Sequence, residues 1–283
     1  MIYNKISGFS DEITEITREQ FKALNKFGIS YFEPRGIDGK NISTLSEEEL
    51  YALKDLMNEY GIQVSSIGSP VGKIKVVDDF EKHLDVLKNV VKAAKILGTK
   101  YVRVFSFYHE KNTEWTEEER KEVFRRLKVM ADYAVEEDVI LLHENEKDIY
   151  GDTADRCLEI MKEFYGPHFK AIFDPANFVQ CKEDTKRAYE MLKPYIAYMH
   201  IKDALFVDES VTPAGYGDGN VEFILSDLLT NGYDGFLSLE PHLVNFKGFA
   251  DLEFDAAVEK KTLNGEEAFE VAHKSLLAIL DRI

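Results

Sequence analysis

Residues 139–144 read Val139-Ile140-Leu141-Leu142-His143-Glu144, a short apolar run that ends on a carboxylate. Three later segments repeat the pattern: Ala171-Ile172-Phe173-Asp174, Ile196-Ala197-Tyr198-Met199-His200 and Gly235-Phe236-Leu237-Ser238-Leu239-Glu240. Short apolar runs of this kind are typical of buried strands in a parallel sheet. In a parallel barrel the carboxyl ends of the strands face one mouth, so the polar side chains that end these runs converge there. These side chains are Glu144, Asp174, His200 and Glu240.

Strand-like and helix-like segments alternate along all 283 residues. The predicted strands are 3–8, 29–33, 62–67, 100–105, 139–144, 170–174, 196–201 and 235–240. The predicted helices are 17–27, 46–60, 79–97, 116–136, 153–165, 184–192, 221–231 and 265–282. Units of about 35 residues in strict alternation are typical of a (β/α)8 barrel. Because no linker or low-complexity segment interrupts them, the sequence predicts an α/β fold, a single (β/α)8 TIM barrel forming one domain over 1–283.

Local signals support the proposed element boundaries. Three predicted helices begin with the spacing of a capping box, in which two side chains satisfy orphaned backbone N–H groups. The pairs are Thr17–Gln20, Ser46–Glu49 and Thr116–Glu119. A glycine follows three predicted helices just before the next strand, where a left-handed cap is expected. These glycines are Gly28, Gly61 and Gly98.

A doubly wound open sheet is the competing architecture, and it usually carries a Gly-rich phosphate loop after its first strand. Here the first predicted strand leads into Ser7-Gly8-Phe9-Ser10-Asp11-Glu12, which lacks the G-x-G-x-x-G pattern. The nearest Gly-rich stretch, Gly215-Tyr216-Gly217-Asp218-Gly219, follows the seventh predicted strand. Barrels often bind phosphate near strands seven and eight, but the motif is weak and a plain flexible loop is the favoured interpretation.

The amino-acid composition limits the classes of molecule that the protein is expected to bind. Lys plus Arg number 35 against 52 Asp plus Glu, a formal net charge of −17, which argues against a nucleic-acid substrate. Solubility alone also explains such acidity. Cys157 and Cys181 show no disulfide framework, and neither a signal peptide nor an apolar run long enough to span a bilayer is present. We expect a cytoplasmic protein with a small-molecule substrate, no nucleic-acid partner and no membrane partner, and homo-oligomer formation stays open.

The ligand types favour a hard divalent cation. Three carboxylates and one imidazole suit Mn²⁺, Mg²⁺ or Co²⁺, and the histidine makes Zn²⁺ compatible as well. We therefore expect one divalent metal ion, with Mn²⁺ favoured. Because side chains alternate along a strand, Glu144 faces the barrel while His143 points towards the helices and is interpreted as structural. By the same alternation Lys202 shares a face with His200 and lies at the mouth, whereas Asp203 lies on the other face.

Several longer motifs carry a resemblance to a known family. They are residues 28–35 (GISYFEPR), 141–145 (LLHEN), 173–177 (FDPAN), 200–204 (HIKDA), 217–219 (GDG) and 232–242 (GYDGFLSLEPH). In these motifs the chain resembles the xylose isomerase-like TIM-barrel superfamily, in its sugar phosphate isomerase/epimerase branch. The resemblance implies that Glu144, Asp174, His200 and Glu240 hold the metal and that Glu144 and Glu240 transfer the proton. One position departs from the pattern, because Asn177 stands where the ketose 3-epimerases often, and the endonuclease IV branch, carry a histidine.

Further polar residues are substrate candidates by their place near the carboxyl ends of predicted strands. They are Glu33, Arg35, Ser66, Ser69, Lys73, Arg103, His109, Glu146 and Lys202. Arginines and lysines at such a mouth commonly bind phosphates, carboxylates or hydroxyls, although ion pairing explains each of them as well.

The leading hypothesis is a divalent-metal-dependent isomerase or epimerase of a sugar, sugar phosphate or polyol-derived ketone. It would act through a metal-stabilised enediolate, with two glutamates as acid and base. The alternative is a dehydratase of the inosose or dehydroshikimate type, which needs a general acid such as Lys202, His109 or Glu146. A metallo-phosphodiesterase is disfavoured by the acidic charge and by Asn177, and a non-catalytic sugar-binding module is disfavoured by the complete ligand set.

Overall fold

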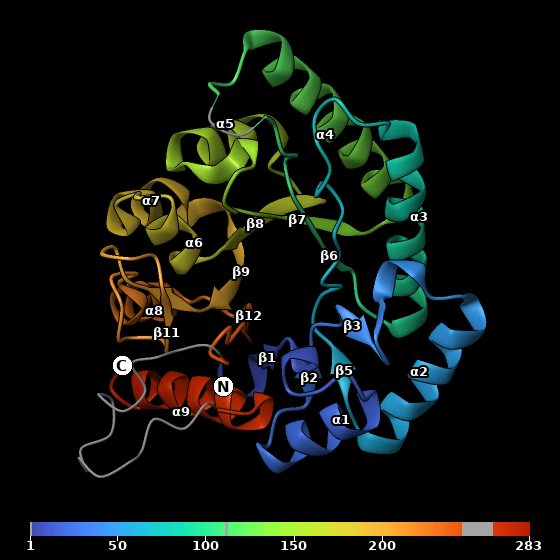
Figure 1. The fold of residues 1–283 in the computed structure, drawn as a ribbon, viewed down its shortest axis with the longest axis vertical. Coiled ribbons are helices and arrows are strands. Elements are labelled where there is room, and N and C mark those ends of the chain that lie inside the picture. Colours follow the sequence, from blue (N-terminus) through green and yellow to red (C-terminus); the bar gives the residue numbers. More distant parts are fainter. Residues whose placement is uncertain (1, 111–112, 245–262) are drawn as a thin grey trace.

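The computed structural model describes residues 2–110, 113–244 and 263–283 (Figure 1). Parallel strands line the centre of this described part and helices surround them (Figure 1). The barrel strands are β1 (Ile6–Gly8), β2 (Tyr31–Phe32), β5 (Gln63–Val64), β6 (Tyr101–Val104), β7 (Ile140–Glu144), β8 (Phe169–Phe173), β9 (Ile196–Ile201) and β12 (Phe236–Leu239). Six of them form a continuous sheet in the order β1-β12-β9-β8-β7-β6, with parallel neighbours throughout.

The two short strands β2 and β5 complete the ring. They pair with each other in parallel. The N–H of Glu33, just after β2, donates to the carbonyl of Gly8 at 2.9 Å, and Ile67, just after β5, forms a parallel bridge with Val102 of β6. The eight barrel strands fall on the eight predicted ones, which confirms the predicted TIM barrel. The prediction that 1–283 forms one domain stays a prediction.

Eight helices of the described part also fall on the predicted ones. They are α1 (Thr17–Lys26), α2 (Glu47–Tyr60), α3 (Phe80–Leu97), α4 (Glu117–Glu137), α5 (Ala154–Phe164), α7 (Thr185–Leu192), α8 (Val221–Thr230) and α9 (Gly265–Leu280). In α4 the residues Val123, Leu127, Met130 and Ala134 recur at helical spacing and are buried. None of the described helices is long and apolar enough to cross a membrane.

Short elements in the loops had no predictable periodicity. They are α6 (Pro175–Gln180), the hairpin of β3 (Gly36–Ile37) and β4 (Lys40–Asn41), and the hairpin of β10 (Asp203–Ala204) and β11 (Val211–Thr212). Single 3-10 turns are η1 (Ile2–Lys5), η2 (Ser10–Glu12), η3 (Ile42–Thr44), η4 (Tyr150–Asp152) and η5 (Lys193–Tyr195). The first predicted strand, 3–8, begins too early. In the structure residues 3–5 belong to the turn η1, and β1 starts at Ile6.

The predicted helix caps hold with one exception. Ser46 and Thr116 form complete capping boxes, and the predicted glycines all have positive φ, between 67° and 87°. The box at Thr17 is wrong, because Thr17 lies inside α1 and Ile16 precedes it as the N-cap residue. The Thr17 hydroxyl instead accepts the N–H of Asp38 at 3.0 Å, while the Asp38 carboxylate accepts the N–H of Thr17 at 2.9 Å. The hairpin turn thus binds the side chain that the capping pattern assigned to the helix.

A layer of apolar side chains fills the barrel below its mouth. Leu142, Ile172, Tyr198 and Phe236 come from β7, β8, β9 and β12 and pack together. Residues two or four positions further along a strand point to the same side, one layer higher. These strands therefore direct the side chains that follow this layer towards one place at the mouth.

Candidate metal centre

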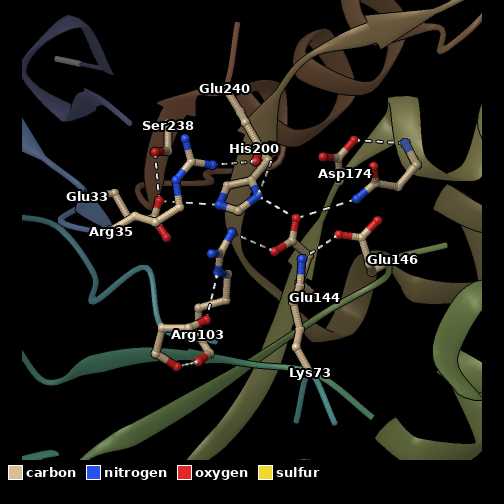
Figure 2. Close-up of polar contacts among 12 residues, drawn as sticks. Glu33, Arg35, Lys73, Arg103, Glu144, Glu146, Asp174, His200, Ser238 and Glu240 are labelled. Atoms are coloured by element: carbon tan, nitrogen blue, oxygen red, sulfur yellow. Dashed lines mark hydrogen bonds and ion pairs between the residues drawn. The ribbon is translucent and has the colours of Figure 1, made fainter. Parts of the chain in front are cut away.

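Four ligand-type side chains lie directly above that apolar layer. They are Glu144, Asp174, His200 and Glu240, and each is buried. Each offers one nitrogen or oxygen atom, and these four atoms all lie within 4.8 Å of one another. Figure 2 shows Glu144 and Glu240 on either side of the His200 ring, with Asp174 next to Glu144. The structure thus brings together the four residues that the sequence predicted as ligands.

The donor set fits a divalent cation. Among the described residues Oδ2 of Asp174 is buried and accepts no hydrogen bond, and the ammonium of Lys202 lies 3.1 Å from it. Because buried carboxylate oxygens normally accept hydrogen bonds, this unused acceptor can serve as a metal ligand. Three carboxylates with one imidazole are suitable ligands for Mn²⁺, Mg²⁺ or Zn²⁺.

Asp174 is held by the turn that follows β8. Its Oδ1 accepts the N–H of Asn177 at 3.0 Å and caps α6, while Asn145 pairs with the backbone of Asp174 through both of its amide atoms at 2.9 Å. The Asn177 amide donates to the carbonyl of Asn145 at 2.9 Å. Asn177, the position that departs from the family pattern, therefore ties together the loops after β7 and β8.

His200 is oriented by a carboxylate from the opposite side of the barrel. Its Nδ1 lies 2.7 Å from Glu144, on the ligand side, and its Nε2 lies 3.2 Å from Oε2 of Glu33. The same Glu33 oxygen accepts hydrogen bonds from the hydroxyls of Tyr198, at 2.8 Å, and Ser238, at 2.7 Å. This pairing favours a proton on Nε2 and leaves Nδ1 as the ligand atom, as for many metal-binding histidines.

Basic side chains neutralise the cluster. Arg103 donates to Glu144 at 3.1 Å, and the Lys202 ammonium lies 2.9 Å from Glu240. Arg35 binds Asp11 through two nitrogens, at 2.8 and 3.1 Å, and lies 3.5 Å from Glu240. Glu33, Arg35, Arg103 and Lys202 are thus in contact with the predicted ligands, as Figure 2 shows for the first three.

These neighbours set the charge of each carboxyl group. Burial alone would raise the pKa of Glu144, but His200 and Arg103 outweigh it and lower that pKa to about 2. The pKa of Glu240 is likewise well below its usual value, because Lys202 and His242 outweigh burial. Burial dominates at Asp174 and raises its pKa to about 6. Both glutamates are therefore ionised at neutral pH.

His200 itself carries charge in the metal-free arrangement. Burial opposes the imidazolium form, but the carboxylates of Glu144 and Glu33 outweigh burial and raise the pKa of His200 well above its ordinary value. A histidine must lose the proton on its ligand nitrogen before it can bind a metal. Metal binding at this cluster should therefore release a proton.

Comparison with known proteins places the chain in a family. Residues 21–262 match the family model described as the xylose isomerase-like TIM barrel. The chain belongs to this family. Among the curated proteins, none matches the sequence significantly.

Solved structures of the same fold include three that span almost the whole chain. The zinc-bound IolI protein has 19% identity and a TM-score of 0.75, covering 98% of both chains. The probable 3-DHS dehydratase AsbF of Bacillus anthracis has 18% identity and a TM-score of 0.73, covering 96% of this chain and 98% of its own. A D-tagatose 3-epimerase-like protein has 17% identity and a TM-score of 0.72, covering 98% and 99%. At these identities the likeness shows the shared fold.

The remaining candidates lie around the centre of this xylose isomerase-like barrel. Lys73 donates to Glu146 at 2.9 Å, beside Glu144 (Figure 2). Ser66 is fully buried, and its hydroxyl has no hydrogen-bond partner among the residues that the structure describes. His109 stacks on Trp115 with 4.1 Å between ring centroids, and among the described contacts it makes none with the four ligand-type residues.

Sequence reasoning missed a second group at the mouth. Atoms of Glu12, Glu240 and His242 also lie within 4.8 Å of one another. Nε2 of His242 is 3.1 Å from Glu12, and the His242 N–H donates to the same carboxylate at 2.7 Å. The available signal was that Asp11 and Glu12 lie three and four residues after β1, in the turn η2, close to the carboxyl end of a barrel strand like the four ligand-type residues.

The Gly-rich loop of residues 215–219 binds a carboxylate of the protein itself. Asp203, which is fully buried, accepts the N–H groups of Gly215 at 3.0 Å and Gly217 at 3.1 Å on Oδ2. Its Oδ1 accepts those of Gly219 at 2.8 Å and Ala204 at 2.9 Å. These N–H groups are of the kind that cradle phosphates elsewhere, and here Asp203 engages them.

Proposed function

We propose that this protein is a divalent-metal-dependent isomerase or epimerase acting on a sugar, sugar phosphate or polyol-derived ketone. The observation that carries the proposal is the buried cluster of four ligand atoms within 4.8 Å of one another. Two of its members are glutamates, so the set that would hold the cation also brings two bases to it. The solved D-tagatose 3-epimerase-like protein of the same fold supports this reaction class.

In this proposal Glu144, Asp174, His200 and Glu240 hold the cation, for which Mn²⁺ is our choice and Mg²⁺, Co²⁺ or Zn²⁺ would also suit the ligands. A divalent cation supplies Lewis-acid polarisation of the substrate carbonyl, which makes the neighbouring C–H more acidic. The similar IolI structure with zinc supports metal binding in this fold.

Glu144 and Glu240 move the proton. One of them takes the proton from the carbon beside the carbonyl, giving an enediolate, and the other returns a proton. Return to the opposite face of the same carbon gives an epimer, and return to the neighbouring carbon gives an isomer. The lowered pKa values of both residues support their presence as carboxylates at neutral pH.

A dehydratase is the second candidate. The specific observation in its favour is the Lys202 ammonium, 2.9 Å from Glu240 and 3.1 Å from Asp174, where it can donate a proton to a leaving hydroxyl. The similar structure of the probable 3-DHS dehydratase AsbF also supports it. Both candidates begin with the same deprotonation, so they differ only in whether water leaves.

We further propose that the substrate is a small carbohydrate-like molecule, that nucleic acid and membranes are not partners, and that the reaction occurs in the cytoplasm. The formal net charge of −17 supports the exclusion of nucleic acid.

The test is solvent exchange. Protein loaded with Mn²⁺ is incubated in D₂O with a panel of ketoses, ketose phosphates, inososes and keto acids, and the products are read by NMR. We expect deuterium at the carbon beside the carbonyl, with a new epimer or isomer. A product that has lost water from the substrate would favour the dehydratase. Turnover without deuterium in the product would exclude proton transfer through glutamates whose protons exchange with solvent. The metal-free protein is the control and should be inactive.

A further inference from the structure

The Gly-rich loop is closed to a substrate phosphate. A Cβ on Gly217 would lie 2.4 Å from Oδ1 of Asp203, and one on Gly219 would lie 2.6 Å from the same atom. The loop backbone therefore sits directly against the buried Asp203 carboxylate and donates to it. Barrels often bind phosphate in this region, after strands seven and eight. In this chain the corresponding backbone donors are engaged by an internal anion.

The basic side chains at the mouth are also engaged. Lys73 lies 2.9 Å from Glu146, Arg103 lies 3.1 Å from Glu144, and Lys202 lies between two ligand-type carboxylates. Arg35 contacts three carboxylates, which are Asp11 at 2.8 Å, Glu12 at 3.2 Å and Glu240 at 3.5 Å. Each of these four cations thus has at least one carboxylate within ion-pair distance.

Carboxylates outnumber the lysine and arginine side chains at the mouth. Its carboxylates are Asp11, Glu12, Glu33, Glu144, Glu146, Asp174 and Glu240. Its lysine and arginine side chains, among the described residues, are Arg35, Lys73, Arg103 and Lys202. With seven carboxylates against four lysine and arginine side chains, a divalent cation would still leave one carboxylate in excess. A phosphate ester would add about 1.5 to 2 negative charges among these carboxylates, and like charges at close range repel one another.

Ion pairs at the mouth do suit hydroxyl groups. A hydroxyl both donates and accepts, and a paired ammonium and carboxylate present a donor and an acceptor side by side. The pair of Lys73 and Glu146 is partly exposed, with 32% and 23% of the two side chains accessible, so it can meet a ligand.

We propose that the substrate is an uncharged polyhydroxy ketone, and that phosphate esters and keto acids are rejected. This inference rests on the proposed function, and it narrows the substrate of the same site. The internal carboxylate in the Gly-rich loop and the paired cations of the mouth select for hydroxyls over anions.

The first test compares a ketose with its own phosphate ester on the Mn²⁺-loaded protein, with deuterium exchange as the readout. We expect kcat/KM for the neutral ketose to exceed that for the ester by at least about 10-fold. A preference for the phosphate ester would overturn the inference while leaving the proposed function intact.

The second test does not depend on activity. Inorganic phosphate is titrated into metal-free protein by calorimetry, and we expect no saturable binding up to about 10 mM. A Kd below about 1 mM would overturn the inference. If no ketose of either kind exchanges, the proposed function fails, and this titration still decides whether the protein binds a phosphate anion.

Two matched variants locate the effect. Glu146→Gln leaves Lys73 at the mouth without its carboxylate, so phosphate binding should appear. Glu137→Gln removes the partner of Lys95 at the end of α4, before β7 begins and hence at the opposite end of the barrel, and phosphate should still not bind. If phosphate affinity increased equally in both variants, binding would depend on the overall charge of the protein. That result would overturn the assignment of the effect to the mouth.

Discussion

The two halves of the barrel differ in regularity and in what they supply. In the second half, β7, β8, β9 and β12 have four to six residues each and pair in one continuous ladder. In the first half, β1 has three residues, β2 and β5 have two each, and β6, with four residues, extends the ladder of the second half. All four ligand-type residues come from the second half, whereas Glu33, Arg35 and Arg103 come from the first.

This difference follows from geometry. A regular ladder fixes side-chain direction by its pleat, so short ligand side chains from neighbouring strands meet above the layer of Leu142 and its partners. Glu33 and Arg35 follow the two-residue strand β2 and contact the cluster through long side chains, whereas Arg103 lies in β6 and contacts Glu144 of the neighbouring strand β7. The second half positions the donors, and the first half balances their charge and orients His200.

The largest expected effect is the loss of turnover when either glutamate of the second half is changed. Glu144→Gln and Glu240→Gln each keep the side-chain size and one oxygen donor but remove the base, so turnover should fall by roughly 10²–10⁴-fold. Metal affinity should fall less, because three other ligands remain. Steady-state rates and metal titrations measure both. Glu137→Gln is the control, and an equal loss of turnover there would remove the special role of the two glutamates.

A second change separates metal binding from folding in the same half. Asp174→Ala removes a ligand and should lower metal affinity by more than about 100-fold, the upper cost of losing an outer partner of a metal site. Asp184→Ala is the matched control, because Asp184 caps α7 as Asp174 caps α6. Each variant should lose about 1 kcal/mol of folding stability, because each removes an N-cap side chain. Calorimetric titration should show lost affinity in Asp174→Ala alone, and unchanged affinity there would refute the ligand assignment.

A substitution in the first half should lower metal affinity less than the loss of a ligand in the second half. Glu33→Gln removes the charge that holds Nε2 of His200 and should lower metal affinity by about 10–100-fold. Asp227→Asn is the control, since it alters a tyrosine–carboxylate hydrogen bond, from Tyr189 at 2.6 Å, away from the cluster. If both variants bind metal like the parent chain, Glu33 does not orient the ligand.

The smallest expected effect is a pH dependence of stability in the first half. Nε2 of His83 accepts the N–H of Gly72 at 2.7 Å, and burial, followed by the charge of Arg126, lowers the pKa of His83. The unfolded chain binds this proton near its ordinary pKa, so stability should decrease as pH falls below about 6.5. Urea unfolding at several pH values measures this, and His83→Gln should make the decrease shallower. If the free energy of unfolding decreased equally steeply with falling pH in the parent chain and in His83→Gln, His83 would be excluded as the cause.

The sequence predicted the regular elements because their signal is local. Apolar runs and helical stripes report burial within one strand or helix, and Ser46, Thr116 and Gly98 mark element ends by contacts within a few residues. The alternation along a strand also placed His143 away from the cluster, and its ring indeed packs against Gly151 and Phe169. The four ligand-type residues could be named because each lies at or just after the carboxyl end of an apolar run.

By itself, then, the sequence determined the barrel and the four strand-end residues that converge at its mouth. Only the tertiary structure decided which polar groups meet across long distances in the chain. Glu33 reaches His200, Asp203 engages the Gly-rich loop, and Thr17 binds Asp38 instead of capping its own helix. The physical reason is that burial follows a periodic pattern along the chain, whereas the partner of a polar side chain depends on which loops the closed barrel brings together.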